Sequence, residues 1–344
     1  MLSEYEKTDD VMKAIRQSNF ELMRIVSMVL ILVHHFICHG ALTSEKNIYG
    51  GEAYILIDSF AIIGVNLFLL ISGYFGIKLS FRSFFYLVFI CFFYKLVHLS
   101  ADTFLLGVSH PVYEWLLKPV FVVSHSGGWF VQVYFMLMFV SPMLNKALEN
   151  MNKKEWLLSL ALLSVIVFYL GWTLHCYNDG AGYTLLNFIF VYFLGATIKR
   201  FNLSSRVPAW CLMMMFLVFS FITFIIHFVS KQVALPVAAM AYNSPFVILS
   251  ACSFFCLFSK LKIQSSIINK IALSVLPVYL LTDGGNLSKV LYNWAVGVSL
   301  DFSMGIALLI YLVVAILLIL FISIIDQLRL FGYKCLARLF PGYL

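Results

Sequence analysis

The sequence is poor in charge: only 11% of its 344 residues are Asp, Glu, Lys or Arg, whereas 62% are hydrophobic. A soluble protein of this length carries roughly a quarter charged residues and about half apolar ones. So little polar surface does not cover a water-soluble globule, and a soluble enzyme or a disordered regulator is therefore excluded. The mean hydropathy of +0.96 instead indicates a polytopic membrane protein.

Basic residues outnumber acidic ones, 23 to 16, but they occur in short groups between apolar stretches. A nucleic-acid-binding surface needs them clustered on one exposed face, so we expect no nucleic-acid partner. The seven cysteines lie mostly inside apolar segments, where a thiol packs as a small hydrophobic group. A secreted disulfide scaffold is therefore excluded as well.

Ten apolar segments are candidates for membrane-spanning helices, because about 20 residues cross the roughly 30 Å hydrocarbon layer. The sequence predicts them at 20–38, 54–75, 84–106, 127–144, 156–174, 183–198, 208–230, 243–259, 266–282 and 304–326. We expect a single all-α membrane domain over the whole chain. Its parts are a cytoplasmic or interfacial leader at 1–19, a core of about ten helices at 20–326 and a cytoplasmic tail at 327–344.

Most of the 23 Lys and Arg residues fall on one side when the predicted spans alternate from a cytoplasmic N-terminus. Four fall on the other side: Lys46, Lys118, Lys231 and Lys289. Because basic residues near span ends are retained in the cytoplasm, we expect both termini to be cytoplasmic. Of the two large outer segments, 107–126 is predicted to lie along the interface or re-enter the membrane, and 283–303 to form a loop.

The first predicted span holds the densest set of ionisable residues, and at membrane depth such residues suggest function. Arg24 and His35 are eleven positions apart, so at about 100° per residue both project from one helix face, about 16 Å apart in depth. A guanidinium binds phosphate or carboxylate bidentately, and a histidine transfers protons near neutral pH. The alternatives are an anchoring role for Arg24 and a hydrogen-bonded structural role for His35.

A metal site is a further possibility in this span, because His35 and His39 have the i, i+4 spacing of two ligands on a helix. No carboxylate or third histidine has an obvious place beside them. The sequence therefore predicts no metal.

Lys78 and Arg82 form a compact basic pair after the second span, suited to anionic headgroups or to the phosphates of a ligand. Asn66 lies inside that span among small and polar residues, which permit close helix contacts and interhelical hydrogen bonds.

Four residues are predicted to form a belt toward the outer face: His125, Trp129, Tyr279 and Asp283. The first two are four positions apart, and so are the last two. An aromatic residue at a membrane interface is commonplace, so these residues are informative only together with other features.

Four segments, in this order, resemble motifs of the integral-membrane acyltransferase-3 family. FELMRIVSMVLILVHHF is similar to its first helix, with Arg, ten residues and then His, and GVNLFLLISGYFGIK to its second. WFVQVYFMLMFVSPMLNKAL resembles its helix that closes in Ser-Pro, and YFLGATIKRF its later Leu-Gly-Ala segment. The resemblance extends over nearly the whole chain.

The resemblance implies an enzyme that moves an acyl group, usually acetyl from acetyl-CoA, to a hydroxyl of a cell-surface polysaccharide or its lipid-linked precursor. It implies a multi-pass protein among the lipids of a bacterial cytoplasmic membrane, with acyl-CoA as a substrate and no permanently bound cofactor. The family's essential Arg and His carry over to Arg24 and His35. Lys78 and Arg82 match its basic residues only loosely, and Thr282 stands where many members have His.

In this interpretation Lys78, Arg82 and Arg24 hold the phosphates of the donor at the inner mouth. His35 acts as the general base on the sugar hydroxyl, or helps to form a transient acyl-enzyme. Asn66 is the candidate donor to the oxyanion, and the outer belt offers stacking faces and hydrogen bonds to the sugar. The alternative function is a multi-pass transporter or flippase of a lipid-linked sugar, which would more often show two related halves. The acceptor glycan, the acyl group and the oligomeric state are left open.

Overall fold

The computed structural model describes residues 17–44, 51–122, 128–176, 180–233 and 236–339, and this part of the chain contains helices and no strands. Within the described residues each of the ten segments predicted as spans contains helix, which confirms the all-α class. Seven helices are long and apolar enough to cross a membrane: Ser18–Thr43, Glu52–Phe75, Phe81–Phe104, Trp129–Asn150, Lys153–Thr173, Ala209–Gln232 and Met304–Leu339.

Three predicted spans take other forms. α11 (Leu185–Arg200) has 16 residues and α14 (Pro245–Ser259) has 15, so they rise only about 22–24 Å, short of a full crossing. The helix pair Ser266–Thr282 and Gly285–Asp301 is bent by 86°. The described residues thus contain seven candidate spans, or eight if the bent pair is one span, and the prediction of about ten is not confirmed.

The predicted outer loop at 283–303 is wrong, because Gly285–Asp301 forms the helix α17. The turn before it uses Gly284 at φ +88°, a backbone conformation that side chains disfavour. Scattered Asn, Lys and Asp residues obscured an apolar stripe at helical spacing. In that stripe Leu291, Ala295 and Val298 pack into the core.

The other outer segment contains a short helix, α7 (Val112–Val120). Its apolar side chains are exposed, with Val112 at 76% and Leu116 at 64%. An exposed apolar face next to a spanning helix suits the interfacial position predicted from the sequence.

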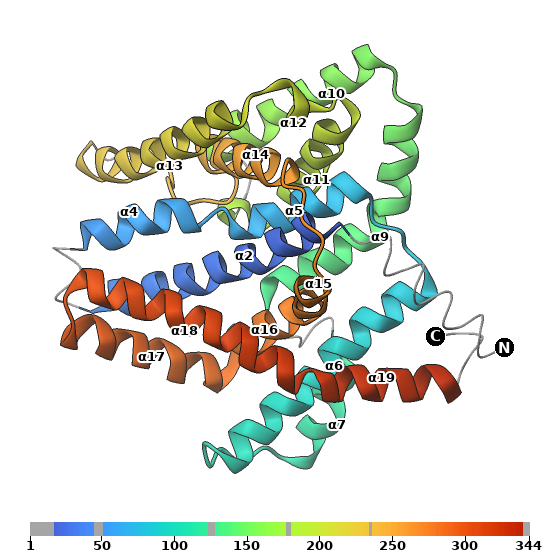
Figure 1. Cartoon of the computed structure of the whole chain (residues 1–344), viewed down its shortest axis with the longest axis vertical. Coiled ribbons are helices and arrows are strands. Elements are labelled where there is room, and N and C mark those ends of the chain that lie inside the picture. The colour runs from blue at the N-terminus through green and yellow to red at the C-terminus, as the bar shows by residue number, and fades with distance from the viewer. Residues whose placement is uncertain (1–16, 45–50, 123–127, 177–179, 234–235, 340–344) are drawn as a thin grey trace.

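α2 (Ser18–His35) lies in the middle of the bundle, between α5 (Gly64–Phe75) and α18 (Met304–Ile325) (Figure 1). α13 (Ala209–Gln232) and α14 cover α4 (Glu52–Ala61) and α5, while α16 (Val275–Thr282) and α17 lie with α18 on the opposite side. Ionisable groups on α2 are therefore surrounded by protein.

α5 and α11 approach closely through glycine. A side chain at Gly73 would meet the carbonyl oxygen of Tyr192 at 1.9 Å, and one at Gly195 would meet that of Leu70 at 2.3 Å. Such small residues let two membrane helices pack backbone against backbone. The Ser-Gly-Tyr and Leu-Gly-Ala segments noted in the sequence are thus the two sides of one contact.

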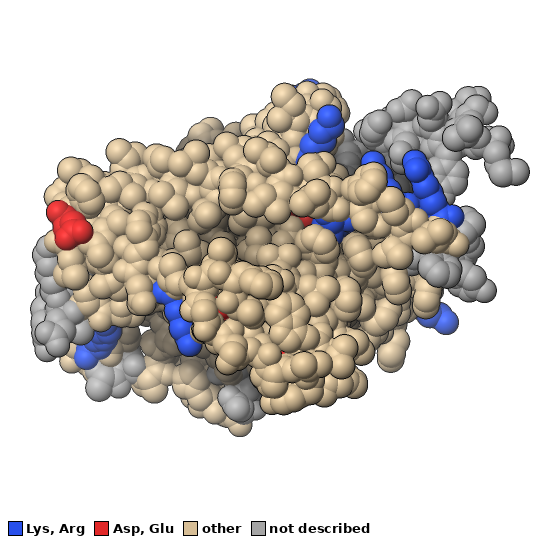
Figure 2. Space-filling model, turned by 90° about the horizontal axis from the view of Figure 1, so that it is seen from below, with Lys and Arg blue, Asp and Glu red and all other residues tan. Residues whose placement is uncertain are grey.

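The outside of the bundle is apolar. Side chains such as Met214 on α13 and Leu317 on α18 are more than half exposed. Figure 2 shows a broad face with few charged residues, and most of its visible Lys and Arg side chains lie toward one end. This is the surface expected of helices that face lipid.

α18 continues into α19 (Gln327–Leu339) through a fully buried ion pair. Arg329 donates to both carboxylate oxygens of Asp326, at 2.6 and 2.7 Å. The same carboxylate accepts hydrogen bonds from Tyr94 of α6 (Phe81–Phe104) and from Ser274. The pair therefore fastens the start of α19 to two other parts of the bundle.

Candidate active site

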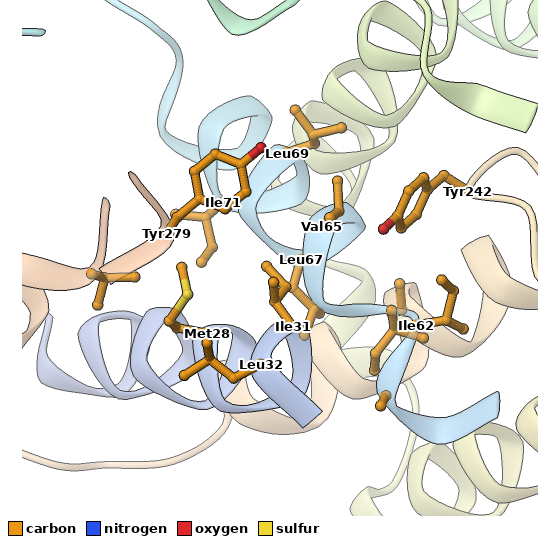
Figure 3. Packing of buried hydrophobic residues seen from close by; sticks show 14 of the residues in the cluster. Met28, Ile31, Leu32, Ile62, Val65, Leu67, Leu69, Ile71, Tyr242 and Tyr279 are labelled. Carbon is orange, nitrogen blue, oxygen red and sulfur yellow. The ribbon is translucent and has the colours of Figure 1, made fainter. Parts of the chain in front are cut away.

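α2 directs Arg24, Met28 and Ile31 into a cavity of about 460 Å³, here called the membrane cavity. The other walls come from α5, α6, α9 (Trp129–Asn150) and α16. In Figure 3 Met28 of α2 extends toward Tyr279 of α16, with Ile71 of α5 beside the tyrosine ring. The lining is mostly apolar, with a few polar groups: Arg24, Ser72, Lys78, Ser83, Tyr86, Tyr134 and Tyr279.

Arg24 is held at this cavity by Glu21, one turn earlier on α2. Its Nη1 donates to the two carboxylate oxygens of Glu21 at 2.9 and 3.0 Å. Nε and Nη2 have no hydrogen-bond partner in the described part of the chain, and the side chain is 35% exposed. The guanidinium thus keeps donors available for an anionic or carbonyl group in the cavity.

A second cavity of about 480 Å³, here called the basic cavity, adjoins the first. Lys78, Lys199 and Arg200 line it, against the single carboxylate of Glu149. Phe75, Gly76 and Lys78 belong to both linings. Lys78 therefore lies where the two cavities meet. The positive charge of the basic cavity suits a polyanion.

Arg200 is fixed at the rim of the basic cavity. Its guanidinium stacks on Trp156 at 4.4 Å from the ring centre and donates to the carbonyls of Leu148 and Met151. Lys199 lies over the ring of Tyr74, at 5.6 Å. Two cations of this cavity are thus placed by aromatic faces rather than by acidic side chains.

The backbone before Lys78 is fixed by two residues that were not predicted from the sequence. Ile77 donates its N–H to the Tyr192 hydroxyl at 2.9 Å, and its carbonyl accepts from Asn145 Nδ2 at 2.8 Å. Tyr192 in turn donates to Asn145 Oδ1 at 2.5 Å. Both residues lie inside the segments that carry the family resemblance, which is the signal that the sequence held.

Arg82 does not share the position of Lys78. It is an exposed residue in the first turn of α6 and lines neither cavity, whereas its neighbour Ser83 does. Of the predicted basic pair, only Lys78 thus lines the cavities. The other positive charges of the basic cavity come from Lys199 and Arg200.

His35 extends the stripe of Arg24, Met28 and Ile31 by one further turn of α2 and is itself 7% exposed. Its ring lies 5.5 Å from that of His39 and 6.2 Å from that of Tyr292 on α17. Nδ1 of His35 is buried and has no hydrogen-bond partner in the described residues. His35 thus lies just beyond the end of the membrane cavity that Ile31 lines, and its Nδ1 is available as a hydrogen-bond acceptor or donor.

Asn66 and Trp129 meet at Tyr242, a residue the sequence did not single out. Asn66 is fully buried and donates to the carbonyl of Tyr242 at 3.0 Å, while its Oδ1 has no partner in the described residues. Trp129 packs its ring on Tyr242 and on Tyr183. Neither Asn66 nor Trp129 lines the two cavities.

The predicted outer belt is divided by the structure. Tyr279 lines the membrane cavity, backed by Gly128, where a side chain would meet the tyrosine hydroxyl at 2.6 Å. Asp283 lies at the bend after α16, within electrostatic range of His39. His125 lies outside the described residues. Thr282, at the family's His position, donates to the carbonyl of Val278 in its own helix.

One comparison with known proteins identifies a family. A protein-family model described as an acyltransferase domain matches residues 17–325. No curated protein and no solved structure matched the chain. The matched range contains all the helices from α2 to α18 and both cavities. The chain belongs to the acyltransferase-3 family.

Proposed function

We propose that this membrane acyltransferase uses acyl-CoA, with acetyl-CoA as the first candidate, and transfers the acyl group to a hydroxyl of a cell-surface polysaccharide or its lipid-linked precursor. The observation that carries the proposal is the junction of the two cavities at Lys78. One cavity is cationic and the other is apolar with an available guanidinium. Coenzyme A has the same division, between its phosphates and its uncharged thioester arm.

In this proposal the phosphates occupy the basic cavity, where Lys78, Lys199 and Arg200 neutralise them. The arm passes Lys78 into the membrane cavity toward Ile31 and His35. Arg24, whose guanidinium has free donors, binds a phosphate or carbonyl oxygen of the donor on the way. The cytoplasm supplies acyl-CoA, so the basic cavity faces the cytoplasm and the protein lies in the cytoplasmic membrane.

The acceptor reaches His35 from the opposite end of α2. His39 is exposed there, and its ring lies 5.0 Å from that of Tyr292. Asp283 lies nearby at the bend before α17. Aromatic faces with a carboxylate suit a sugar, whose ring stacks and whose hydroxyls donate. Donor and acceptor then meet at His35 from two sides.

The chemical step needs a proton acceptor at this meeting point. The acceptor hydroxyl oxygen attacks the thioester carbonyl carbon while His35 takes the hydroxyl proton. The tetrahedral oxyanion collapses, the carbon–sulfur bond breaks, and His35 returns the proton to the departing thiolate. The products are the sugar ester and free coenzyme A.

Family membership favours this function over the transporter alternative, which would need neither a coenzyme site nor a proton acceptor beside it. The test is calorimetric titration of the detergent-solubilised protein with acetyl-CoA. We expect saturable binding that the Lys78→Gln variant weakens at least about tenfold, since a charge-assisted hydrogen bond contributes about 1.5–3 kcal/mol. Lys146→Gln, an exposed lysine outside both linings, is the matched control.

Unchanged affinity in Lys78→Gln would place the donor elsewhere. Absence of acetyl-CoA binding by the wild-type protein, with binding of a lipid-linked sugar instead, would favour the transporter.

A further inference from the structure

Three metal-ligating side chains meet at the far end of α2, beside His35 but on another face. His34 Nδ1 lies 2.6 Å from Asp58 Oδ1, and Cys38 Sγ lies 3.2 Å from Asp58 Oδ2. The thiol is also 3.5 Å from His34 Nδ1. Within the described residues these ligand atoms form a group in which all lie within 4.8 Å of one another.

We propose that His34, Cys38 and Asp58 bind one Zn²⁺ ion. Zinc accepts nitrogen, thiolate sulfur and carboxylate oxygen with bonds of about 2.0–2.3 Å, so tetrahedral ligands lie about 3.3–3.6 Å apart. The sulfur–nitrogen distance of 3.5 Å already agrees with this spacing, and the sulfur–oxygen distance of 3.2 Å is slightly shorter than it. The His34–Asp58 contact of 2.6 Å opens by about 0.7 Å as the ion replaces the shared proton.

The local backbone brings the ligands together. His34 ends α2, and the chain then forms a π-helical turn, η1 (Phe36–Gly40), that contains Cys38. π-Helical turns occur frequently at functional sites. Asp58 reaches the pair from α4 and is 2% exposed, whereas Cys38 is only half-buried. The ion therefore has a route past Cys38, and water fills the fourth position.

Asp58 is paired with His34 in the structure, and zinc would take over that pairing. Burying a carboxylate is costly unless it is paired, and here its two oxygens face a nitrogen and a thiol that both become ligands on losing a proton. Zinc would also fix η1, which carries His39, and would hold His34 5.7 Å from the ring of His35. The binding is independent of the acyl transfer proposed above.

The experiment uses full-length protein purified in detergent without a metal-affinity tag, equilibrated with zinc and freed of excess metal. We expect about one zinc per chain by mass spectrometry, and loss of it in Cys38→Ser and Asp58→Asn. Cys176→Ser, which changes an exposed cysteine, is the matched control and keeps the ion. Replacing zinc by Co²⁺ in the wild-type protein is expected to give the near-ultraviolet thiolate-to-cobalt charge-transfer band.

The cobalt spectrum needs no substitution, so it decides the matter even if a variant fails to fold. A wild-type protein that binds no stoichiometric zinc, or a cobalt complex without the thiolate band, would overturn the proposal. So would a folded Cys38→Ser variant that binds zinc as the wild type does.

Discussion

Tyr192 holds Ile77, the residue before Lys78, by accepting the hydrogen bond of its backbone N–H at 2.9 Å. The tyrosine comes from α11, and the isoleucine from the connection between α5 and α6. This contact therefore joins the backbone next to Lys78, at the junction of the two cavities, to a helix that lines the basic cavity. The position of the cation is therefore set by the fold rather than by its own side-chain partners.

Tyr192→Phe removes this acceptor and leaves the buried N–H of Ile77 without a partner, which costs about 1–3 kcal/mol. Because Lys78 loses its support, we expect the dissociation constant for acetyl-CoA to rise about fivefold or more in calorimetric titration. Tyr333→Phe is the control, since that hydroxyl makes no hydrogen bond within the described residues. Wild-type affinity in Tyr192→Phe would contradict this role.

Gly73→Ala tests the contact between α5 and α11. The added carbon would lie 1.9 Å from the Tyr192 carbonyl oxygen, so the helices must separate. We expect a loss of about 1–3 kcal/mol or more and a lower midpoint of thermal unfolding in detergent. Gly305→Ala, where no atom lies within 4 Å of the new carbon, is expected to unfold as the wild type does. Equal midpoints for the two variants would show that the close packing is unnecessary.

Asp326→Ala leaves the guanidinium of Arg329 buried and unpaired. Breaking a buried ion pair from one side costs about 3–5 kcal/mol, whereas replacing both partners by apolar residues is often neutral. We therefore expect a large fall in the unfolding midpoint for Asp326→Ala and a recovery when Arg329→Leu is added to Asp326→Leu. Asp301→Ala changes an exposed carboxylate and is the control. A single variant as stable as the wild type would refute the structural role of the pair.

Local patterns were sufficient to predict that Arg24 and Lys78 would lie near one another, and both line the membrane cavity. The eleven-residue spacing placed Arg24 and His35 on one face of α2, and the structure has Met28 and Ile31 between them along the membrane cavity. Lys78 was identified by its position after an apolar span. In both cases the predicted residues are close in sequence, and helix geometry then determines where they point.

Pairings between distant residues were not predictable in the same way. Asp58 lies 24 residues after His34, and nothing in the sequence around His34 indicates which residue pairs with it. Arg329 was counted among the charges that set topology, but a count of basic residues does not distinguish an exposed charge from one paired with Asp326. The helix α17 was not predicted because polar residues are interspersed with its apolar stripe. That stripe is recognised only from its packing against neighbouring helices.

The central claim is that His35 takes the proton of the acceptor hydroxyl during acyl transfer. It is tested most directly by following radiolabelled acetyl groups from acetyl-CoA into the glycan of membranes that contain equal amounts of wild-type or His35→Ala protein. Loss of a general base lowers the rate roughly 10²- to 10⁴-fold, while acetyl-CoA binding and the midpoint of unfolding are expected to stay near those of the wild type. His227→Ala, a half-buried histidine on α13, is expected to transfer acetyl normally. Wild-type transfer by His35→Ala would contradict the account.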